Sequence, residues 1–461
     1  METMVKDLNA GLIDDFAKTI RGEVILPQHT AYNNARKIYN AMIDRRPGVI
    51  VKCVDVADVI YTVNFARENH LQVAVRGGGH NGGGLGICDE GLVIDLSGIK
   101  YVRIDPQDNT VRVGAGNMWG EVDHATHAFG LAVPAGIIST TGVGGLTLGG
   151  GVGYLTRKFG LSIDNLLEVD MVLADGSFVT ASDKEHPDLF WAVRGGGGNF
   201  GIVTSFRFQA HELKTVIAGP TLWPVEKTEE VMEWYDRFIH NAPEDLNGFF
   251  ATLTIPGAPF PESLHGRKFC GVIWCYTGDP GEFDKLFEPV RNMDPEFEHV
   301  GEMPYPALQS MFDGLLPPGL QWYWRADFFN ELGPEVRKAH LRFSSNMPTP
   351  LSQMHLYPIT GAAAKRSNKD TAWAYRDARY AGVIVGVDPN PTNAKKISDW
   401  CKDYWEATHP FSAGGAYSNF MMDEGENRVK ASYRDNYDRL VEVKRKYDPH
   451  NFFHLNQNIK P

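Results

Sequence analysis

Cysteine is scarce in this sequence, and so are the patterns in which cysteine usually acts. The 461 residues contain five cysteines, and no two of them form a Cys-x-x-Cys pair. An odd number without paired spacing argues against a disulfide framework and against a zinc site. We therefore expect free, buried thiols and a reducing compartment, the cytoplasm. The cysteines are Cys53, Cys88, Cys270, Cys275 and Cys401.

Positive charge and long apolar runs are also lacking. Lysine and arginine number 45 against 57 acidic residues, which gives a net charge of −12, and no basic stripe is present. Nucleic acids are bound by clustered Lys and Arg, so they are not an expected partner. No run of 18 apolar residues could span a membrane, and the first residues lack the pattern of a secretory signal.

The remaining composition is that of a folded protein with more than one core. Hydrophobic residues make up 43%, aromatic residues 11% and charged residues 22% of the chain. These fractions are typical of globular domains. A chain of 461 residues exceeds the size of a single compact core, which predicts two domains.

Glycine is abundant and clustered. The chain has 48 glycines, and the first cluster follows a short apolar run as Arg76-Gly-Gly-Gly-His80-Asn-Gly-Gly-Gly. Without Cβ atoms the backbone can adopt positive φ, and its N–H groups can converge on an anion such as a pyrophosphate. Arg76 adds a positive charge, and His80 adds a nucleophilic imidazole. From this motif alone, a flexible loop with an incidental histidine is an equally good interpretation.

Four more blocks follow in a fixed order. They occupy residues 134–165, which contain Gly-Val-Gly-Gly and Gly-Gly-Gly-Val-Gly, and residues 188–203, 416–420 and 447–458. Together with the first loop, they resemble the berberine-bridge-enzyme-like branch of the vanillyl-alcohol-oxidase superfamily. Five blocks in order are far more specific than one glycine motif.

The resemblance implies an α+β, two-domain PCMH-type FAD-binding fold. We expect an FAD-binding domain over residues 1–210, with its PCMH-type core at about 45–210. Near residue 210 the pattern changes to alternating strands and longer helices, so a substrate-binding domain with an antiparallel sheet and helices is expected over 211–413. Residues 414–461 are expected to return and complete the FAD-binding domain.

In the resembled family the histidine of this loop carries a covalent 8α bond to FAD, which assigns that role to His80. Many relatives add a cysteinyl link at the position of Ile138, and many have histidine at the position of Leu146. A single covalent link is therefore expected. The FAD-binding residues implied are Arg76, Gly77, Gly78, Gly79, His80, Asn81, Gly82, Ser139, Thr140, Thr141, Gly142, Gly145, Gly149, Gly150, Gly153, Ile202, Val203, Asn456 and Gln457.

A second nucleotide motif is incomplete, so we expect no nicotinamide site. Gly114-Ala-Gly116 lies between an expected strand and helix, but the Rossmann pattern requires glycine where the chain has Trp119. Periodicity further predicts helices within 10–45, with an amphipathic one at 31–43, and at 56–69, 118–129, 187–193, 228–240 and 334–343. Strands are predicted at 48–54, 71–75, 92–96, 110–113, 168–174 and 201–208.

Aromatic and polar residues alternate in the second domain, with side chains on shared strand faces. Such a pattern fits either a solvent face or a ligand-facing wall. With tryptophan and histidine among these residues, we expect a substrate wall that includes Trp322, Trp324, Gln353, Trp373 and Tyr375. The groups are Trp322 with Trp324; Gln353 with His355 and Tyr357; and Trp373 with Tyr375.

The chemistry requires a group that accepts a proton from the substrate. We rank Tyr417 first and His355 second, with Tyr357 as a further candidate and Asn419 as a hydrogen-bond partner. A phenol has a reference pKa of about 10, so Tyr417 needs a lowered pKa to act near neutrality, whereas histidine needs no such shift.

The expected function is that of an FAD-linked oxidase. By the resemblance, a hydride passes from a C–H bond of a small organic alcohol, amine or secondary metabolite to FAD. The electrons then pass to dioxygen and give hydrogen peroxide. A carbohydrate oxidase, a dehydrogenase with another acceptor and a flavin-binding protein without turnover are the alternatives. In the resembled family, the residue at the position of Thr141 influences the access of oxygen and is usually valine or leucine. The sequence therefore does not decide between dioxygen and another electron acceptor.

Overall fold

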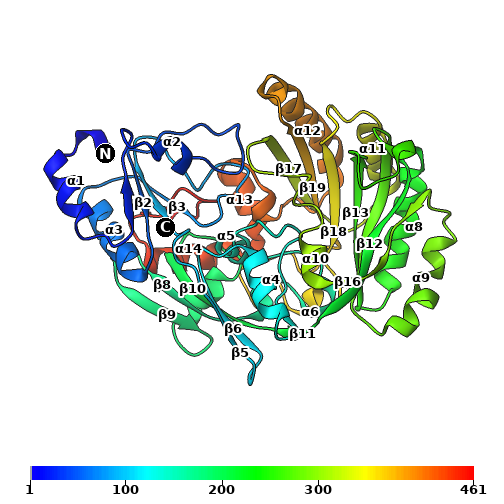
Figure 1. The fold of residues 1–461 in the computed structure, drawn as a ribbon, viewed down its shortest axis with the longest axis horizontal. Helices are drawn as coiled ribbons and strands as arrows, with labels where there is room; N and C mark the ends of the chain where they lie inside the picture. The colour runs from blue at the N-terminus through cyan, green and yellow to red at the C-terminus, as the bar shows by residue number, and fades with distance from the viewer. Residues whose placement is uncertain (1–2) are drawn as a thin grey trace.

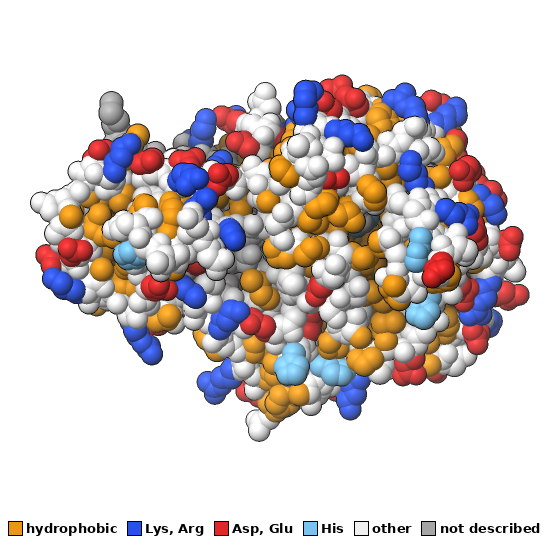
Figure 2. Space-filling model, turned by 45° about the horizontal axis from the view of Figure 1, so that its top comes forward, with side chains coloured by type: hydrophobic (Ala, Val, Ile, Leu, Met, Phe, Trp, Pro, Cys, Tyr) orange, Lys and Arg blue, Asp and Glu red, His pale blue; other side chains and the backbone are white. Residues whose placement is uncertain are grey.

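The structure, a computed structural model, describes residues 3–461 and divides into two regions that meet along a central cavity (Figure 1). The first region contains a four-stranded and a five-stranded sheet, and the second is built on an eight-stranded sheet. Among residues 3–461, no helix is long and apolar enough to cross a membrane. Acidic and basic side chains are interspersed over the face shown in Figure 2, without a large basic patch.

The four-stranded sheet delivers the first glycine loop. Its strand order is β1-β2-β4-β3, and β4 is parallel to both β2 and β3. All four residues of β4 are buried. The strand is accordingly an apolar run, with Asp95 as its last residue. The strands are β1 (Glu23–Ile25), β2 (Val49–Lys52), β3 (Val73–Arg76) and β4 (Leu92–Asp95), and α3 (Val56–Glu68) connects β2 to β3.

The five-stranded sheet is antiparallel, in the order β5-β6-β10-β8-β9. Its strands are β5 (Val102–Asp105), β6 (Thr110–Gly114), β8 (Leu166–Val172), β9 (Phe178–Ser182) and β10 (Ile202–Gln209). Helices α4 (Trp119–His127), α5 (Val143–Gly149), α6 (Thr156–Phe159) and α7 (Pro187–Val193) lie in its connections.

The eight-stranded sheet of the second region is antiparallel at every pairing. It consists of β12 (Thr215–Pro224), β13 (Leu246–Thr254), β14 (Lys268–Tyr276), β15 (Phe297–Glu298), β16 (Gly301–Pro304), β17 (Gln321–Phe329), β18 (Gln353–Pro358) and β19 (Tyr380–Asp388). Side chains alternate between two cores. Phe250 belongs to the core under the outer helices, whereas Phe249 and Ala251 belong to the core shared with the first region.

Four helices cover the outer face of this sheet (Figure 1). They are α8 (Thr228–Asn241), α9 (Phe283–Arg291), α11 (Pro334–Ser345) and α12 (Ala394–Thr408). Because these helices occupy one face, the other face remains for the cavity. The chain then returns through α13 (Glu426–Tyr433) and α14 (Tyr437–Tyr447), and α14 packs on α7 in the first region.

Most of the predicted helices and strands are present. The helices expected at 56–69, 118–129, 187–193, 228–240 and 334–343 correspond to α3, α4, α7, α8 and α11. The five cysteines are buried and free, as expected. The glycine-rich stretch of the second block contains α5, and its helical form shows that packing outweighs the low helix propensity of glycine here.

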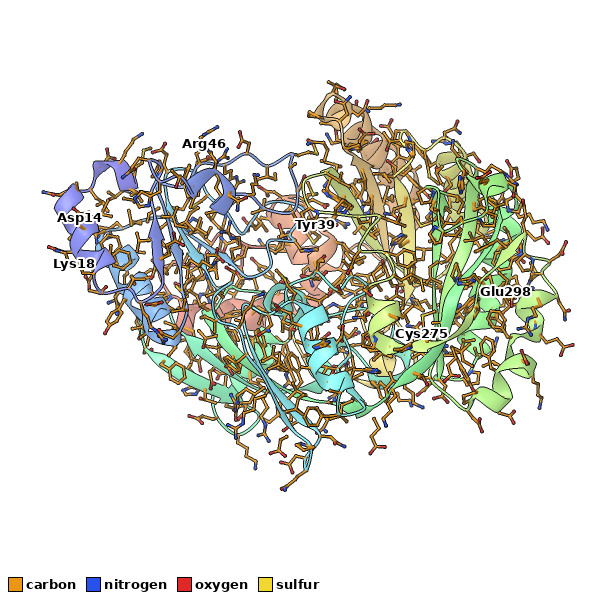
Figure 3. All side chains as sticks on the ribbon, in the orientation of Figure 1. Asp14, Lys18, Tyr39, Arg46, Cys275 and Glu298 are labelled. Carbon is orange, nitrogen blue, oxygen red and sulfur yellow. The ribbon has the colours of Figure 1, made fainter. Side chains whose placement is uncertain are left out.

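The amphipathic helix predicted over residues 31–43 is wrong. The helical part of this stretch is α2 (Tyr32–Ala35), and β1 lies in the upstream stretch that was also expected to be helical. Long-range backbone bonds replace the helix, because the Tyr39 N–H donates to the Gly79 carbonyl and the Ala41 N–H to the Leu320 carbonyl. In Figure 3, Tyr39 lies where the two regions meet.

A buried ion pair anchors the returning segment. The ammonium group of Lys444 donates to Asp448 at 2.7 Å and to the carbonyls of Asn199 and Phe453 at 2.7 and 2.9 Å. Both side chains of the pair are 0% exposed. Asp448 in turn accepts from the N–H groups of Phe452 and Phe453. The ammonium has three satisfied donors, which compensates for its loss of hydration.

We expect Lys444→Met to lower the free energy of unfolding by about 3–5 kcal/mol, because it leaves the Asp448 carboxylate buried without a counter-charge. Lys446→Met is the matched control on the same helix, since Lys446 pairs with Asp188 at an exposed site worth about 0–1 kcal/mol. Calorimetric melting of both variants measures the difference. Equal melting temperatures would contradict this assignment.

Candidate functional site

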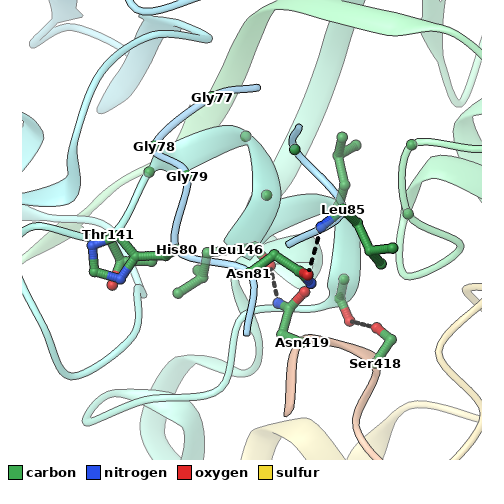
Figure 4. Close-up of a pocket in the computed structure, with 18 of the residues that line it drawn as sticks. Gly77, Gly78, Gly79, His80, Asn81, Leu85, Thr141, Leu146, Ser418 and Asn419 are labelled. Atoms are coloured by element: carbon green, nitrogen blue, oxygen red, sulfur yellow. Dashed lines mark hydrogen bonds between the residues drawn. The ribbon is translucent and has the colours of Figure 1, made fainter. Parts of the chain in front are cut away.

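The central cavity has a volume of about 350 Å³ and is lined by both regions. The first region contributes the loop after β3, helix α5 and the start of β10 (Figure 4). The second contributes strands β17, β18 and β19. The segment after α12 adds residues 417–420, and the chain beyond α14 adds residues 453 and 455–457. Segments far apart in the sequence therefore share one cavity.

The two glycine loops touch through their backbones. A Cβ atom on Gly78 would lie 2.6 Å from the backbone nitrogen of Gly142, and one on Gly142 would lie 2.5 Å from that of Gly78. Real Cβ atoms do not approach backbone so closely, so both positions require glycine. Gly79 also requires it, because its φ is +70°. This contact fixes the distance between the His80 loop and helix α5.

His80 lies between a tyrosine ring and a threonine hydroxyl. Its ring stacks on Tyr39 with centroids 4.0 Å apart and planes 20° apart. Its Nε2 lies 3.3 Å from Thr140 Oγ1. Burial lowers the pKa of His80 to about 4, so the imidazole is neutral at neutral pH. A neutral, oriented imidazole is the nucleophilic form.

Arg76 lines the cavity, but its charge is already compensated. Its guanidinium donates to Asp95 at 2.7 Å, and both side chains are less than 10% exposed. The positive charge that the sequence places at the end of β3 is thus paired within the protein. The exposed N–H groups of the glycine loops remain as the groups suited to an anion.

Most of the residues expected to bind the cofactor line the cavity. They are Arg76, Gly77, Gly78, Gly79, His80, Asn81, Thr141, Gly142, Gly145, Gly149, Ile202, Val203, Asn456 and Gln457. Five others do not line it: Gly82, Ser139, Thr140, Gly150 and Gly153.

These five residues have structural roles beside the cavity. Gly82 packs under Trp324, Gly150 faces Trp373, and Gly153 faces the Ala135 carbonyl. The Ser139 N–H donates to Asp313 at 3.0 Å, and Thr140 contacts His80. They belong to the same glycine-rich blocks as the lining residues, so the motif alone did not separate the two groups.

Strand β18 carries a hydrogen-bonded triplet into the cavity. His355 Nδ1 lies 2.7 Å from the Tyr357 hydroxyl, and His355 Nε2 lies 2.9 Å from Gln353 Oε1. Burial lowers the pKa of His355 to about 3 and raises that of Tyr357 well above its ordinary value. A neutral His355 that donates from Nε2 to Gln353 accepts the Tyr357 proton at Nδ1. The side chains at 353, 355 and 357 share one strand face, as predicted.

Tyr417 is held by the first region and by its own segment. Its hydroxyl accepts hydrogen bonds from the Gly151 N–H at 2.8 Å and from Asn419 Nδ2 at 2.7 Å. These donors favour the phenolate, but burial outweighs them and raises the pKa of Tyr417 to about 12. The lowered pKa that the sequence argument required for Tyr417 is therefore not present in the protein alone.

Trp322 and Trp324 form an aromatic wall, and their rings meet edge to face with centroids 6.1 Å apart. The same role was expected for Trp373 and Tyr375, and that expectation is wrong. Residues 371–379 form no strand, and both side chains are buried away from the cavity. Tyr375 stacks on Phe328 with centroids 4.2 Å apart. Alternation of aromatic residues therefore did not distinguish a wall from a packed core.

Several lining residues had no signal in the sequence. Tyr39 comes from the stretch expected to be helical, and its stacking on His80 depends on long-range backbone bonds. Val383 and Val385 lie on β19 and read as ordinary core residues. Tyr433 lies between the blocks at 416–420 and 447–458, and Phe453 lies within the latter block but had no assigned role.

The cavity wall fits a large flat cofactor. A Cβ atom on Gly145 or Gly198 would meet no protein atom within 4 Å, although both residues line the cavity. Their backbones therefore face open space that a ligand can fill. Trp322 Nε1, Trp324 Nε1 and Asn456 Oδ1 are buried without a hydrogen-bond partner among residues 3–461. Since buried polar atoms are normally paired, a bound molecule is the expected partner.

Comparisons with known proteins agree with this geometry. A family model described as an FAD binding domain matches residues 47–182, and one described as "Berberine and berberine like" matches residues 416–460. An FAD-linked oxidoreductase of Dictyostelium discoideum is 30% identical over 467 residues, covering 100% of this chain and 99% of that protein. (R)-6-hydroxynicotine oxidase of Paenarthrobacter nicotinovorans is 28% identical, covering 96% and 97% of the two chains.

The fold has a close structural counterpart. The crystal structure of 6-hydroxy-D-nicotine oxidase from Arthrobacter nicotinovorans superposes with a TM-score of 0.88 and 25% identity, covering 99% of this chain and 100% of that one. The predicted α+β PCMH-type FAD-binding fold is thereby confirmed. The chain belongs to the berberine-bridge-enzyme-like family of FAD-linked oxidoreductases and is an FAD-binding enzyme of the oxidoreductase class.

Proposed function

We propose that this enzyme is an oxidase for a small, neutral organic amine or alcohol, with FAD attached covalently through His80 and dioxygen as the electron acceptor. The observation that carries the proposal is the neutral Tyr357–His355 pair facing the same cavity as His80. When bound, FAD accepts the hydrogen and electron pair of the substrate C–H bond.

The surroundings of His80 support the covalent link. Tyr39 stacks on the ring and Thr140 contacts Nε2, so the imidazole has one orientation. Its lowered pKa keeps it unprotonated, and only that form can attack an electrophile. Ile138 lines the cavity where a second link would need cysteine, and none of the five cysteines lines it.

The charge of the cavity supports a neutral substrate. Its ionisable lining residues are Arg76, His80 and His355 together with tyrosines. Arg76 is paired with Asp95, and both histidines are neutral at neutral pH. An unpaired charge on a substrate would lose hydration without gaining a counter-charge. An uncharged amine or alcohol fits this environment, and the oxidase of 6-hydroxynicotine among the relatives supports the same class.

The hydrogen-bonded triplet on β18 supports the route of the proton. The substrate N–H or O–H gives its proton to the Tyr357 oxygen while Tyr357 passes its own proton to His355 Nδ1. Gln353 holds the proton on His355 Nε2 throughout. This relay leaves Tyr357 neutral and places a positive charge on His355. Burial disfavours charge at both residues, so the charge lasts only while the hydrogen is transferred. Tyr417 accepts two hydrogen bonds, so its own proton remains to orient the substrate.

The purified protein should retain its flavin after acid precipitation and unfolding. His80→Ala should release the flavin into the supernatant, because no second residue supports a link. Tyr39→Phe is the matched control, since it keeps the stacked ring and removes only the hydroxyl. Flavin that separates from the unmodified protein in acid would show that the link does not form.

Substrate should bleach the yellow flavin absorption under nitrogen, and air should restore it with one hydrogen peroxide per cycle. Panels of secondary amines, aromatic alcohols and oligosaccharides, followed by absorption spectroscopy, test the substrate class. If only oligosaccharides bleach the flavin, the substrate class is carbohydrate and the proposed amine or alcohol is wrong. Bleaching that air does not reverse would assign another acceptor.

Tyr357→Phe and His355→Ala should each lower the anaerobic rate of flavin reduction by about 10²–10⁴-fold, the range for general-base catalysis. Tyr417→Phe should act mainly on KM. Because the pKa of His355 is about 3, kcat/KM should show no inflection from this group between about pH 5 and 9. A histidine inflection of kcat/KM near pH 6–7, or loss of flavin reduction in Tyr417→Phe alone, would contradict the assignment of the proton acceptor to Tyr357 and His355.

A further inference from the structure

A second, smaller cavity adjoins the central one. Its volume is about 60 Å³, and it shares five lining residues with the central cavity, among them Leu316, Gln353 and His355. The two cavities therefore meet at the face of β18 that carries the proton relay. We call the smaller cavity the side chamber.

The floor of the side chamber is the inner face of the large sheet. Phe249, Ala251 and Leu253 alternate along β13 and line it. Ala251 is paired with His355 across β13 and β18, and Phe249 with Ile273 across β13 and β14. The chamber thus begins one strand away from the residue that we assign to the proton relay.

The roof of the side chamber is held by hydrogen bonds. Phe312, Leu315 and Leu316 line the chamber from the segment between α10 (Tyr305–Gln309) and β17. Asp313, in the same segment, accepts from the Ser139 N–H at 3.0 Å. The Leu316 carbonyl accepts from the Tyr39 hydroxyl at 2.7 Å. The roof is therefore tied to Tyr39, which stacks on His80, and to Ser139, the chain neighbour of Thr140.

The chamber offers almost no polar group to a ligand. Its polar lining residues are Thr254, Gln353 and His355, of which Gln353 and His355 bond to each other. Thr254 Oγ1 contacts the sulfur of Met347 at 3.9 Å. A water needs two to four polar partners to be stable in a cavity, and apolar cavities remain dry. An apolar group gains dispersion contacts there that water cannot replace.

We propose that the side chamber binds an apolar alkyl or aryl arm of the substrate, so that the substrate carries its reacting C–H bond next to such an arm. This inference rests on the proposed function, because it takes the reacting group to lie beside Tyr357 and His355. The chamber extends towards Pro256, which is exposed, and Phe260, which is half-buried. An arm of several carbons can therefore be accommodated.

Unbranched 1-alkanols from ethanol to 1-octanol test the proposal with the flavin-loaded enzyme under nitrogen. Perturbation of the flavin absorption spectrum gives a Kd for each alcohol, and the melting temperature gives a second measure of binding. We expect the Kd to fall about fourfold for each added methylene, the fold-change that corresponds to about 0.8 kcal/mol. The fall should end once the arm has filled the chamber.

Substitutions in the floor should change this dependence in opposite directions. Ala251→Leu fills the chamber, so the ratio of the ethanol and hexanol Kd values should approach one. Leu253→Ala enlarges it and should extend the fall to longer alkanols. Ala251→Ser keeps the space open and is the matched control. If Ala251→Leu does not fold, the Kd values of Leu253→Ala alone still test whether the chamber binds the alkyl chain.

Kd values independent of chain length, or equally dependent in all three variants, would overturn the proposal. Slower reoxidation of the flavin by air in Ala251→Leu, with unchanged alkanol Kd values, would instead make the chamber a dioxygen path and would also overturn it. Failure of the proposed function has a different signature. In that case the alkanols would bind with the expected chain-length dependence, but no substrate of the amine and alcohol panels would bleach the flavin.

Discussion

The site depends on one contact, the meeting of Gly78 and Gly142 backbone to backbone. Neither position leaves space for a Cβ atom, so the loop after β3 and helix α5 are as close as two chain segments can be. This closeness places His80 and the N–H groups of both loops around one cavity. A glycine-rich sequence usually means flexibility, but here the glycines allow tight packing of two segments that the rest of the fold holds in place.

The two faces of the eight-stranded sheet have different surroundings. One face packs against helices, and the other lines the cavity. Helices α8, α9, α11 and α12 bury one face, so every second residue of β13, β17, β18 and β19 is free to face the first region. On β18 this face carries the hydrogen-bonded triplet, and on β13 it carries the small and apolar residues of the side chamber. The proposed proton relay and the proposed site for the substrate arm thus lie on adjacent strands with the same two-residue repeat.

The sequence predicted local features well and long-range ones poorly. His80 and its loop were identified because their signal lies within nine residues, and α7 was predicted with its exact bounds because Pro187 begins a compact apolar stretch. The stretch at 31–43 failed because its backbone groups bond to Gly79 and Leu320, which the local pattern does not contain. The pKa values of Tyr417 and His355 were also beyond prediction, because they follow from burial by distant segments.

The return of the chain through α14 has a consequence for biogenesis. Asn456 and Gln457 line the central cavity. Their segment is anchored by Lys444, which pairs with Asp448 and donates to the Asn199 carbonyl in the first region. A ribosome makes these residues after the whole second region, so the pocket cannot close while that region is being synthesised. We therefore expect flavin loading to follow the folding of both regions. Premature chain release upstream of α14 would give a protein with all of its described strands but without the cavity residues at 453 and 455–457.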